Sequence, residues 1–278
     1  MEAERFIVSV EVVPPAGPDP EPVLAALESL ADLPVDGFSV ATNPVARPRM
    51  SALALCALIQ QRTGRPATLH CTTRDHNRLS LWGLLWGARA LGIQRVLVAT
   101  GDFVALGDRA TTTTVRDVDV FDLVRMAREV PLRTGVVFDA HPESNVLEQA
   151  VRRLARKVEA GAQFAVTQPV YDEASAQVLL AATRQVGIPI VMGILPLRTP
   201  RHAEFLHQRV AGIAVPRAVR ERMERASDPV TEGAANAREM LRVAREGFRG
   251  ACLMPPFGHY EVVGDVLRGG GGRGFGDS

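Results

Sequence analysis

The sequence has little cysteine and almost no charge imbalance. Only three of its 278 residues are cysteines, and Cys56, Cys71 and Cys252 lie far apart. An odd number of scattered cysteines argues against a disulfide framework and against a clustered zinc site. The 32 basic and 31 acidic residues leave a formal net charge of +1. A nearly neutral chain has no overall electrostatic attraction for nucleic acid or an anionic membrane, so neither is expected as a partner.

Long apolar runs are also missing. No stretch approaches the roughly 18 apolar residues that suggest a membrane-spanning helix. The first residues, Met-Glu-Ala-Glu-Arg, are acidic and lead directly into a strand-like run, unlike a secretory signal peptide. The composition is that of an ordinary globular protein, with 46% hydrophobic and 23% charged residues. Together these features predict a soluble cytoplasmic protein.

The motifs of several common enzyme classes are absent. The stretch Gly101–Gly107 lacks the lysine and the serine or threonine of a P-loop, and no Gly-x-Gly-x-x-Gly opens a helix after a strand. No Gly-x-Ser-x-Gly supports a serine nucleophile, and Cys71 is predicted to lie within a strand end. His70 and His141 lack a convincing third metal ligand at suitable spacing, so no metal is expected.

What the chain does have is a regular alternation of strand-like and helix-like segments. Several helical segments end in glycine, as at Gly92 and Gly161, where glycine accepts the left-handed backbone that closes a helix. Eight such units in about 250 residues predict a (β/α)8 TIM barrel rather than an open doubly wound sheet, although strand order leaves that alternative open. The predicted strands are Phe6–Val13, Gly37–Ala41, Ala67–Cys71, Arg95–Ala99, Thr134–Phe138, Gln163–Thr167, Pro189–Ile194 and Gly250–Met254. The predicted helices between them are Pro22–Leu33, Met50–Thr63, Leu79–Leu91, Val120–Glu129, Asn145–Ala160 and Glu173–Val186.

Two stretches depart from this alternation. The connection Asp102–Asp119 after the fourth strand is long, and such loops are either ligand walls or ordinary surface loops. Before the eighth strand, two extra helices are predicted at Pro216–Ala226 and Gly233–Glu246. We expect one barrel domain over residues 1–268 and a disordered glycine-rich tail over residues 269–278.

Polar side chains recur at the carboxyl ends of the predicted strands. In a parallel barrel these ends share one face, where active sites form. Pro14 and Pro15 end the first strand just after Glu11, which leaves an acid at that face. The set is Glu11, Asn43, His70, Asp102, His141 and Gln168, from the first six strands. Singly each has an ordinary explanation in turns or packing, but their shared position favours a real site.

Basic residues on the helix after the fifth strand form a second feature. Arg153, Arg156 and Lys157 share one helix face that could neutralise a diphosphate, although such a stripe is usually a solvated surface. A dinucleotide can therefore bind without a glycine-rich fingerprint. The residues together predict acid catalysis combined with recognition of a cofactor or substrate.

The ordered motifs resemble the methylenetetrahydrofolate reductase family over nearly the whole chain up to Leu267. They are closest to the reductase module of bacterial bifunctional proteins that also carry a homocysteine methyltransferase. The matching motifs are Val-Glu-Val-Val-Pro-Pro at Glu11, Leu-His-Cys-Thr at His70, Leu-Val-Ala-Thr-Gly-Asp ending at Asp102, Lys-Val-Glu-Ala-Gly-Ala-Gln-Phe-Ala-Val-Thr-Gln ending at Gln168, and Gly-Ile-Leu-Pro ending at Pro196. Two longer matches, Asn43–Ser51 and Pro196–Phe205, point to the bifunctional subgroup.

The resemblance implies an FAD-containing enzyme that uses NADH or NADPH to convert 5,10-methylenetetrahydrofolate into 5-methyltetrahydrofolate. Glu11 matches the general acid that opens the imidazolidine ring, and an apolar pocket could raise its pKa for that role. Asp102 matches the carboxylate that holds the pterin and stabilises the iminium cation. Gln168 matches an amide that contacts folate, and His202 lies in a motif implied to bind the substrate.

The same resemblance implies a set of flavin contacts, and it also has gaps. The implied contacts are Thr42, His70, Thr100, Gly101, Asp102, His141 and Lys157. Thr100 stands where many family members have arginine, Ala150 where an acid is expected, and His259 where an arginine for folate is usual. Val40-Ala-Thr-Asn43 likewise replaces the common Val-Thr-Tyr-Gly. These departures weaken the phosphate and adenine contacts more than the catalytic pair.

Two alternatives follow from those gaps. One is a relative that reduces folate without bound flavin or with electrons from a partner subunit. The other is a folate-binding protein without catalysis, against which the presence of both Glu11 and Asp102 speaks. The sequence does not distinguish NADH from NADPH. A homo-oligomer is expected because members of the family commonly form one.

Overall fold

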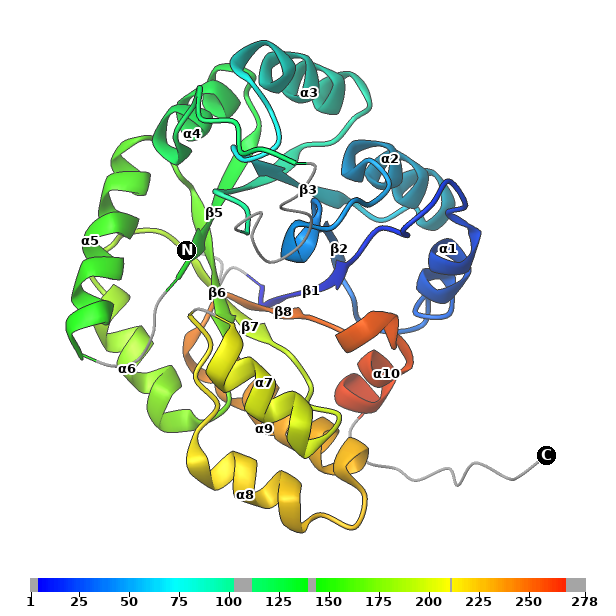
Figure 1. Cartoon of the computed structure of the whole chain (residues 1–278), viewed down its shortest axis with the longest axis vertical. Helices are drawn as coiled ribbons and strands as arrows, with labels where there is room; N and C mark the ends of the chain where they lie inside the picture. Colours follow the sequence, from blue (N-terminus) through cyan, green and yellow to red (C-terminus); the bar gives the residue numbers. More distant parts are fainter. Residues whose placement is uncertain (1–4, 103–111, 140–143, 211, 269–278) are drawn as a thin grey trace.

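The computed structural model describes residues 5–102, 112–139, 144–210 and 212–268, and its centre is a closed barrel of parallel strands (Figure 1). Each strand pairs with the next along the chain, and β1 pairs with β8. The closure confirms the TIM barrel and rules out the open sheet. The strands are β1 Ile7–Val12, β2 Gly37–Val40, β3 Ala67–Thr72, β4 Arg95–Ala99, β5 Arg133–Phe138, β6 Phe164–Pro169, β7 Ile190–Ile194 and β8 Gly250–Leu253.

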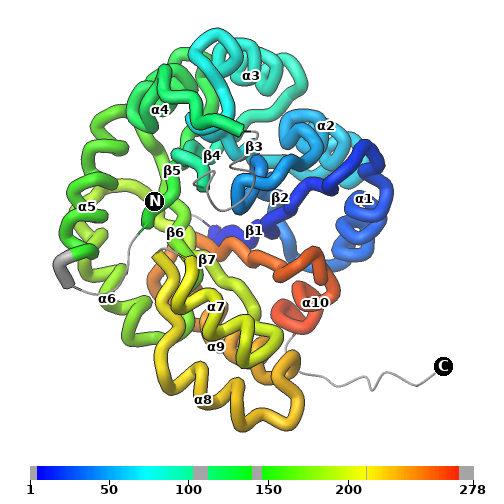
Figure 2. The backbone as a smooth tube through the Cα atoms, in the orientation of Figure 1, coloured from blue at the N-terminus to red at the C-terminus, as the bar shows by residue number. Residues whose placement is uncertain are grey.

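Helices surround the barrel and cover its outer face (Figure 2). Each of β1 to β7 is followed by a helix. After β2, a short 3-10 turn at Pro44–Ala46 precedes helix α2. The two helices predicted before the eighth strand are α8 and α9, and both are present. The helices are α1 Glu21–Glu28, α2 Ala52–Thr63, α3 Arg78–Ala90, α4 Val120–Glu129, α5 Ser144–Glu159, α6 Glu173–Thr183, α7 Pro200–Arg209, α8 Arg217–Arg225, α9 Pro229–Gly247 and α10 Glu261–Arg268.

Helix α1 is shorter than the periodicity predicts. The apolar spacing suggested a helix to Leu33, but α1 ends at Glu28 and the chain continues in turns. The guanidinium of Arg65 donates hydrogen bonds to the carbonyl oxygens of Leu30 and Leu33, both at 3.2 Å. A side chain distant in sequence thus binds carbonyl groups of the turns that stand in place of the last part of the predicted helix.

The strand β1 shows how the sequence aims a polar residue into the barrel. Val8, Val10 and Val12 are buried beneath the surrounding helices, while Ser9 and Glu11 alternate with them on the opposite face. Side chains on a strand alternate between its two faces, so valine on one face requires the intervening residues to point inward. The prolines that follow end β1 with Glu11 one residue from its last position.

Apolar side chains fill part of the barrel interior. Leu97, Val166 and Cys252 are buried in one interior cluster, and Phe164 packs against it. Phe164 occupies space that is available because residue 135 is glycine: a Cβ added at Gly135 would lie 2.2 Å from the phenyl ring. The barrel interior is therefore packed with side chains here and is not an open channel.

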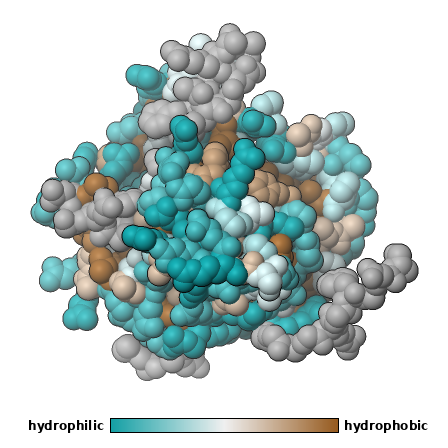
Figure 3. All heavy atoms as spheres, turned by 60° about the horizontal axis from the view of Figure 1, so that its bottom comes forward, coloured by the Kyte–Doolittle hydropathy of each residue, from teal (hydrophilic) through white to brown (hydrophobic). Residues whose placement is uncertain are grey.

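The surface shown in Figure 3 is largely hydrophilic, with apolar residues in small separate groups. Among the described residues, no helix combines the length and apolarity needed to cross a membrane. The tail over residues 269–278 and the single-domain boundary at residue 268 stay predictions, because the tail lies outside the described residues.

We expect Gly233→Ala to destabilise the fold. A Cβ at Gly233, near the start of α9, would lie 1.8 Å from the carbonyl oxygen of Leu197, so the helix would have to move. Such overpacking costs about 1–3 kcal/mol, measurable as a lower midpoint of urea unfolding.

Gly83→Ala is the matched control. Nothing lies within 4 Å of a Cβ at this position inside α3, so alanine should leave stability unchanged or raise it by up to about 1 kcal/mol. Equal midpoints for the two variants would contradict the close packing of α9.

Candidate active site

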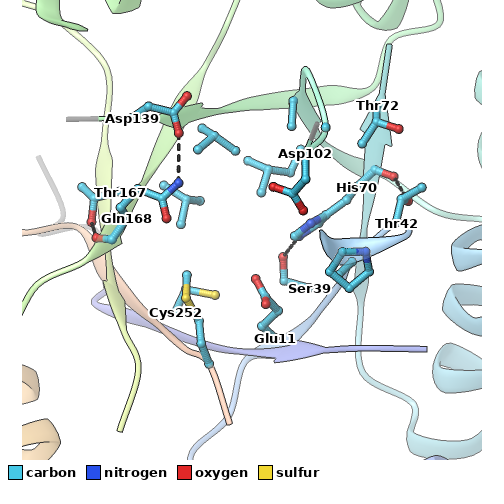
Figure 4. Close-up of a pocket in the computed structure, with 18 of the residues that line it drawn as sticks. Glu11, Ser39, Thr42, His70, Thr72, Asp102, Asp139, Thr167, Gln168 and Cys252 are labelled. Atoms are coloured by element: carbon cyan, nitrogen blue, oxygen red, sulfur yellow. Dashed lines mark hydrogen bonds between the residues drawn. The ribbon is translucent and has the colours of Figure 1, made fainter. Parts of the chain in front are cut away.

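A cavity of about 330 Å³ opens at the carboxyl ends of the strands. Glu11 from β1, His70 from β3 and Cys252 from β8 lie on its walls, together with Asp102 from the loop after β4 and Gln168 from β6 (Figure 4). Of the residues predicted for the site, Glu11, Thr42, His70, Thr100, Gly101, Asp102, Lys157 and Gln168 all line this one cavity. The shared strand-end position thus brings together most of the residues that the sequence selected.

Glu11 is partly accessible through the cavity, but protein surrounds its carboxyl group. Burial raises the pKa of Glu11 from its ordinary value of 4.5 to about 7, and the negative charge of Asp102 adds to the effect. A carboxylic acid with that pKa still carries its proton in a large fraction of molecules at neutral pH. Glu11 can therefore donate a proton, which an ordinary glutamate at this pH cannot.

His70 is fixed beside Glu11 by two neighbours from β2 and its loop. Its Nε2 lies 2.7 Å from the Ser39 hydroxyl, and the Thr42 hydroxyl donates to its backbone carbonyl at 2.5 Å. Burial lowers the pKa of His70 from 6.5 to about 4, so the imidazole is neutral at physiological pH. A neutral imidazole on the cavity wall can form hydrogen bonds, but it does not stabilise a negative charge as a protonated ring would.

Asp102 stands at the mouth of the cavity on a sharp turn. Gly101 before it has φ +89°, a conformation that favours glycine. One carboxylate oxygen of Asp102 accepts a hydrogen bond from the backbone N–H of Val45 at 2.5 Å. The carboxylate is exposed, and a second oxygen remains to interact with a ligand.

Gln168 lies across the cavity from Asp102 (Figure 4). Its side chain is held by the carboxylate of Asp139, a residue that the sequence analysis did not select. Its amide nitrogen donates to Asp139 at 2.9 Å (Figure 4). Gly212 packs against it, since a Cβ there would lie 3.3 Å from the Gln168 side chain. The amide nitrogen is therefore directed toward Asp139, which leaves the amide oxygen as an acceptor for a ligand.

Lys157 is only 4% exposed and reaches the cavity wall from α5. Its ammonium group donates to the carbonyl oxygen of Val137 at 2.6 Å. Burial lowers the pKa of Lys157, while Asp139 acts in the opposite direction and Arg153 adds to the lowering. The buried amine thus faces the cavity near the acid that orients Gln168.

A second hollow of about 520 Å³ shares Asp139 with the first cavity. Its walls on α5 include Ala150, Arg152, Arg153 and Arg156. The guanidinium groups of Arg153 and Arg156 also lie 5.5 and 4.4 Å from the centre of the Phe121 ring, which holds them against α4. Arg153 and Arg156 of the predicted basic helix face therefore line a hollow next to the main cavity, whereas Lys157 lines the main cavity itself.

Of the described residues predicted for the site, Asn43 and His202 do not line the cavity. His202 is on α7 outside the cavity lining, where its ring packs against Phe257 with centroids 5.1 Å apart. Burial and the nearby charge of Arg198 lower the pKa of His202 to about 4. His141 lies outside the described residues. Substrate binding by His202 and cofactor binding by His141 stay predictions.

The sequence prediction also missed several residues that line the cavity. Ser39, Thr72 and Cys252 point inward by strand alternation, and the parity of their strands could have identified them. Asp139 directly follows the predicted end of the fifth strand, so the rule applied to the other strand ends could have selected it. Among the described residues, no group of three histidine, cysteine or acidic side chains is placed to hold a metal ion.

Comparison with known proteins agrees with this arrangement. The family model for methylenetetrahydrofolate reductase matches residues 1–250. The chain belongs to the methylenetetrahydrofolate reductase family. Membership supports the reduction of methylenetetrahydrofolate as the general activity, and it confirms the resemblance drawn from the sequence motifs.

Individual methylenetetrahydrofolate reductases are distant relatives. A 5,10-methylenetetrahydrofolate reductase of Pectobacterium carotovorum subsp. carotovorum is 27% identical over 256 residues, covering 88% of this chain and 84% of that protein. A probable methylenetetrahydrofolate reductase (NADPH) of Caenorhabditis elegans is 25% identical over 157 residues, which are 53% of this chain and 23% of the longer protein. A solved structure, an uncharacterized protein from Clostridium thermocellum that binds two copies of 5-methyl-5,6,7,8-tetrahydrofolic acid, has a TM-score of 0.69 at 14% identity, with 95% of each chain covered. That similarity supports the fold.

The raised pKa of Glu11 predicts a pH-dependent stability. The folded protein holds this proton up to a pH near 7, whereas the unfolded chain releases it near 4.5, so stability falls as the pH rises through this window. The loss is at most about 3 kcal/mol and is complete above the folded-state pKa. Glu11→Gln removes this dependence, so its stability relative to wild type should increase between about pH 5 and about pH 8 in urea unfolding.

The control is Glu129→Gln, the same chemical change at an exposed position on α4. Its effect on stability should be small and equal at the two pH values. A Glu11→Gln effect that is also independent of pH would show that burial does not perturb the carboxyl group of Glu11.

Proposed function

We propose that the protein reduces 5,10-methylenetetrahydrofolate to 5-methyltetrahydrofolate, with NADH or NADPH as the electron donor and FAD as the cofactor. The observation that carries this proposal is the inward-facing Glu11, whose pKa of about 7 leaves it able to act as an acid. The Clostridium thermocellum barrel, which binds the product of this reaction, indicates that the fold can accommodate a reduced folate. A cytoplasmic location and a homo-oligomeric state stay predictions from the sequence.

Glu11 has the central role in the chemistry. The five-membered ring of the substrate opens when the bond between N10 and the methylene carbon breaks, and the departing nitrogen needs a proton. Glu11 supplies that proton, since its neutral form persists to near pH 7. The methylene group is left as an iminium on N5, and addition of a hydride to its carbon gives the methyl product. One proton and one hydride are consumed, and NAD(P)+ is released.

Asp102 and Gln168 orient and stabilise the substrate in this scheme. The carboxylate of Asp102 lines the same cavity as Glu11, so it can stabilise an iminium cation that forms there. The amide oxygen of Gln168, left available by the bond to Asp139, can accept from an amino or N–H group on the ligand. His70 stays neutral and adds no competing positive charge beside the cation.

The residues present fit a flavin dinucleotide. The main cavity offers hydroxyl, imidazole and backbone groups at Thr42, His70 and Gly101 for a polar ring system. The adjoining hollow adds three arginines on α5, which suit a diphosphate, although Ala150 supplies no acidic partner for a sugar. When bound, FAD supplies two-electron transfer between the nicotinamide and the folate.

Assays of the two half-reactions test the assigned role of Glu11. Glu11→Gln should lower methylenetetrahydrofolate reduction by about 100-fold or more, because glutamine cannot donate the proton. Oxidation of NAD(P)H with menadione as the acceptor should stay near the wild-type rate, since that half-reaction needs no proton from Glu11. Loss of both activities together would refute the role of Glu11 as a folate-specific acid.

Flavin binding is tested separately. Purified protein titrated with FAD should develop the visible absorption of bound flavin, and Arg153→Ala with Arg156→Ala should weaken binding about tenfold or more. The paired control is Arg217→Ala with Arg225→Ala on α8, which removes the same charge from an exposed helix. Folate reduction by NAD(P)H without bound flavin would instead support the flavin-independent alternative. Folate binding without reduction would support a binding protein that lacks catalysis.

A further inference from the structure

Arg74, directly after β3, is a buried arginine that the proposed chemistry does not use. Its side chain is 3% exposed and does not line the cavity. Its Nε and Nη2 donate to the two carboxylate oxygens of Asp75 at 2.6 and 2.7 Å. Such a two-point pair fixes the plane of the guanidinium, so the remaining N–H groups have defined directions.

Those remaining groups reach two other loops. Nη1 of Arg74 donates to the carbonyl oxygen of Asp102 at 3.0 Å, and Nη2 donates to the carbonyl oxygen of Asn43 at 3.1 Å. The backbone N–H of Arg74 also donates to the carbonyl of Thr100 at 3.1 Å. One side chain thus connects the loops that follow β2, β3 and β4.

Asp75 extends the same connection. Its carboxylate accepts from the Asn43 side-chain amide and from the Thr72 hydroxyl, both at 3.2 Å. Burial alone would raise the pKa of Asp75, but the bonds from Arg74, Asn43 and Thr72 lower it overall. The pair is therefore a charged and well-satisfied hub, and removing one member would leave the other buried without its partner.

The loop that the hub holds after β2 is strained. Asn43, Val45 and Ala46 have φ values of 42°, 52° and 53°, in the left-handed region that non-glycine residues rarely adopt. Such a backbone conformation is unfavourable for a residue with a side chain and persists only where surrounding contacts enforce it. Here the contacts are Arg74 on the carbonyl of Asn43 and Asp102 on the N–H of Val45.

The turn formed by Thr100 and Gly101 packs directly against Arg74. A Cβ at Gly101 would lie 3.1 Å from the Arg74 Cβ and 3.4 Å from its Cζ, so only glycine allows the turn to pack on this side chain.

We propose that Arg74, held by Asp75, is a positioning residue that sets the place of the Asp102 carboxylate relative to Glu11. The inference rests on the proposed function for its effect on catalysis. Its geometric part concerns only where Asp102 lies and can be tested without turnover.

A change in the position of Asp102 would shift the pKa of Glu11 in a known direction. The charged and titratable groups that act on or face its carboxyl group are Asp102 on the β4 loop, His70 on β3, Cys252 on β8 and Tyr260 before α10, with Lys157 and Asp139 on other parts of the cavity wall. Asp102 is the one whose charge raises the pKa of Glu11. If Asp102 moves away, the pKa of Glu11 falls, and the acid loses its proton at a lower pH.

The experiment compares Arg74→Lys, Asp75→Asn and Arg65→Lys. Lysine keeps the charge at position 74 but cannot make the two-point pair, and Asp75→Asn tests the same hub if Arg74→Lys does not fold. Arg65→Lys is the matched control, because Arg65 also tethers backbone carbonyls but does so near α1, outside the cavity lining. Titration of Glu11 is followed by carboxyl ¹³C NMR, with Glu11→Gln identifying the signal.

We expect the Glu11 titration midpoint to fall by about half a pH unit or more in Arg74→Lys and Asp75→Asn, and to stay unchanged in Arg65→Lys. The turnover number for folate reduction should fall about tenfold in the hub variants, with its alkaline limb moved to lower pH by the same amount. An unchanged Glu11 midpoint in folded hub variants would overturn the proposal and leave Arg74 a purely structural residue. Absence of folate reduction in the wild type would refute the proposed function, while the NMR titration would still decide the position of Asp102.

Discussion

Pairing of β1 with β8 is the constraint on which the rest of the molecule depends. Residues nearly 250 positions apart, such as Ser9 and Cys252, become neighbours in that register, and the sheet closes on itself. Closure turns eight strand ends into one rim, so side chains from separate strand–helix units surround one volume. The helices bury the outward valines and leucines of the strands, which fixes the inward direction of the alternating polar residues. Glu11 therefore owes its place to the packing of Val10 and Val12 on the other face of its strand.

The electrostatics of the cavity follow from the same packing. Burial raises the pKa of Glu11 and lowers that of His70, so near pH 7 His70 is neutral and Glu11 keeps its proton in a large fraction of molecules. Charge is kept at the edges, where Asp102 stands at the mouth and Asp139 lies near Lys157. A mostly uncharged interior with a carboxylate at its mouth suits the proposed reaction, in which the neutral ring of the substrate becomes transiently cationic.

Local patterns in the sequence predicted the elements well, because apolar alternation, proline stops and glycine caps act over a few residues. The eight strands, the two extra helices before β8 and the gathering of Glu11, His70, Asp102 and Gln168 follow from such signals. Contacts between loops could not be predicted from such local signals. The bonds from Arg74 to Asn43 and Asp102 depend on which strands are neighbours and on their register, neither of which one strand encodes. The end of α1 was misjudged for a similar reason, since Arg65 lies more than thirty residues away from the carbonyls that it satisfies.

The position of Arg74 has a consequence for how such barrels diverge. Adjacent strands lie only about 4.8 Å apart, less than the length of an arginine side chain, so a guanidinium can approach the same turn from either of two strand ends. An arginine on either of two neighbouring loops can then contact the same turn, although its position in the sequence differs. Threonine at position 100, where the resemblance to the family leads one to expect arginine, therefore does not by itself show that the turn lacks a guanidinium contact. Covariation in such families should therefore be sought between columns of adjacent strands as well as within one motif.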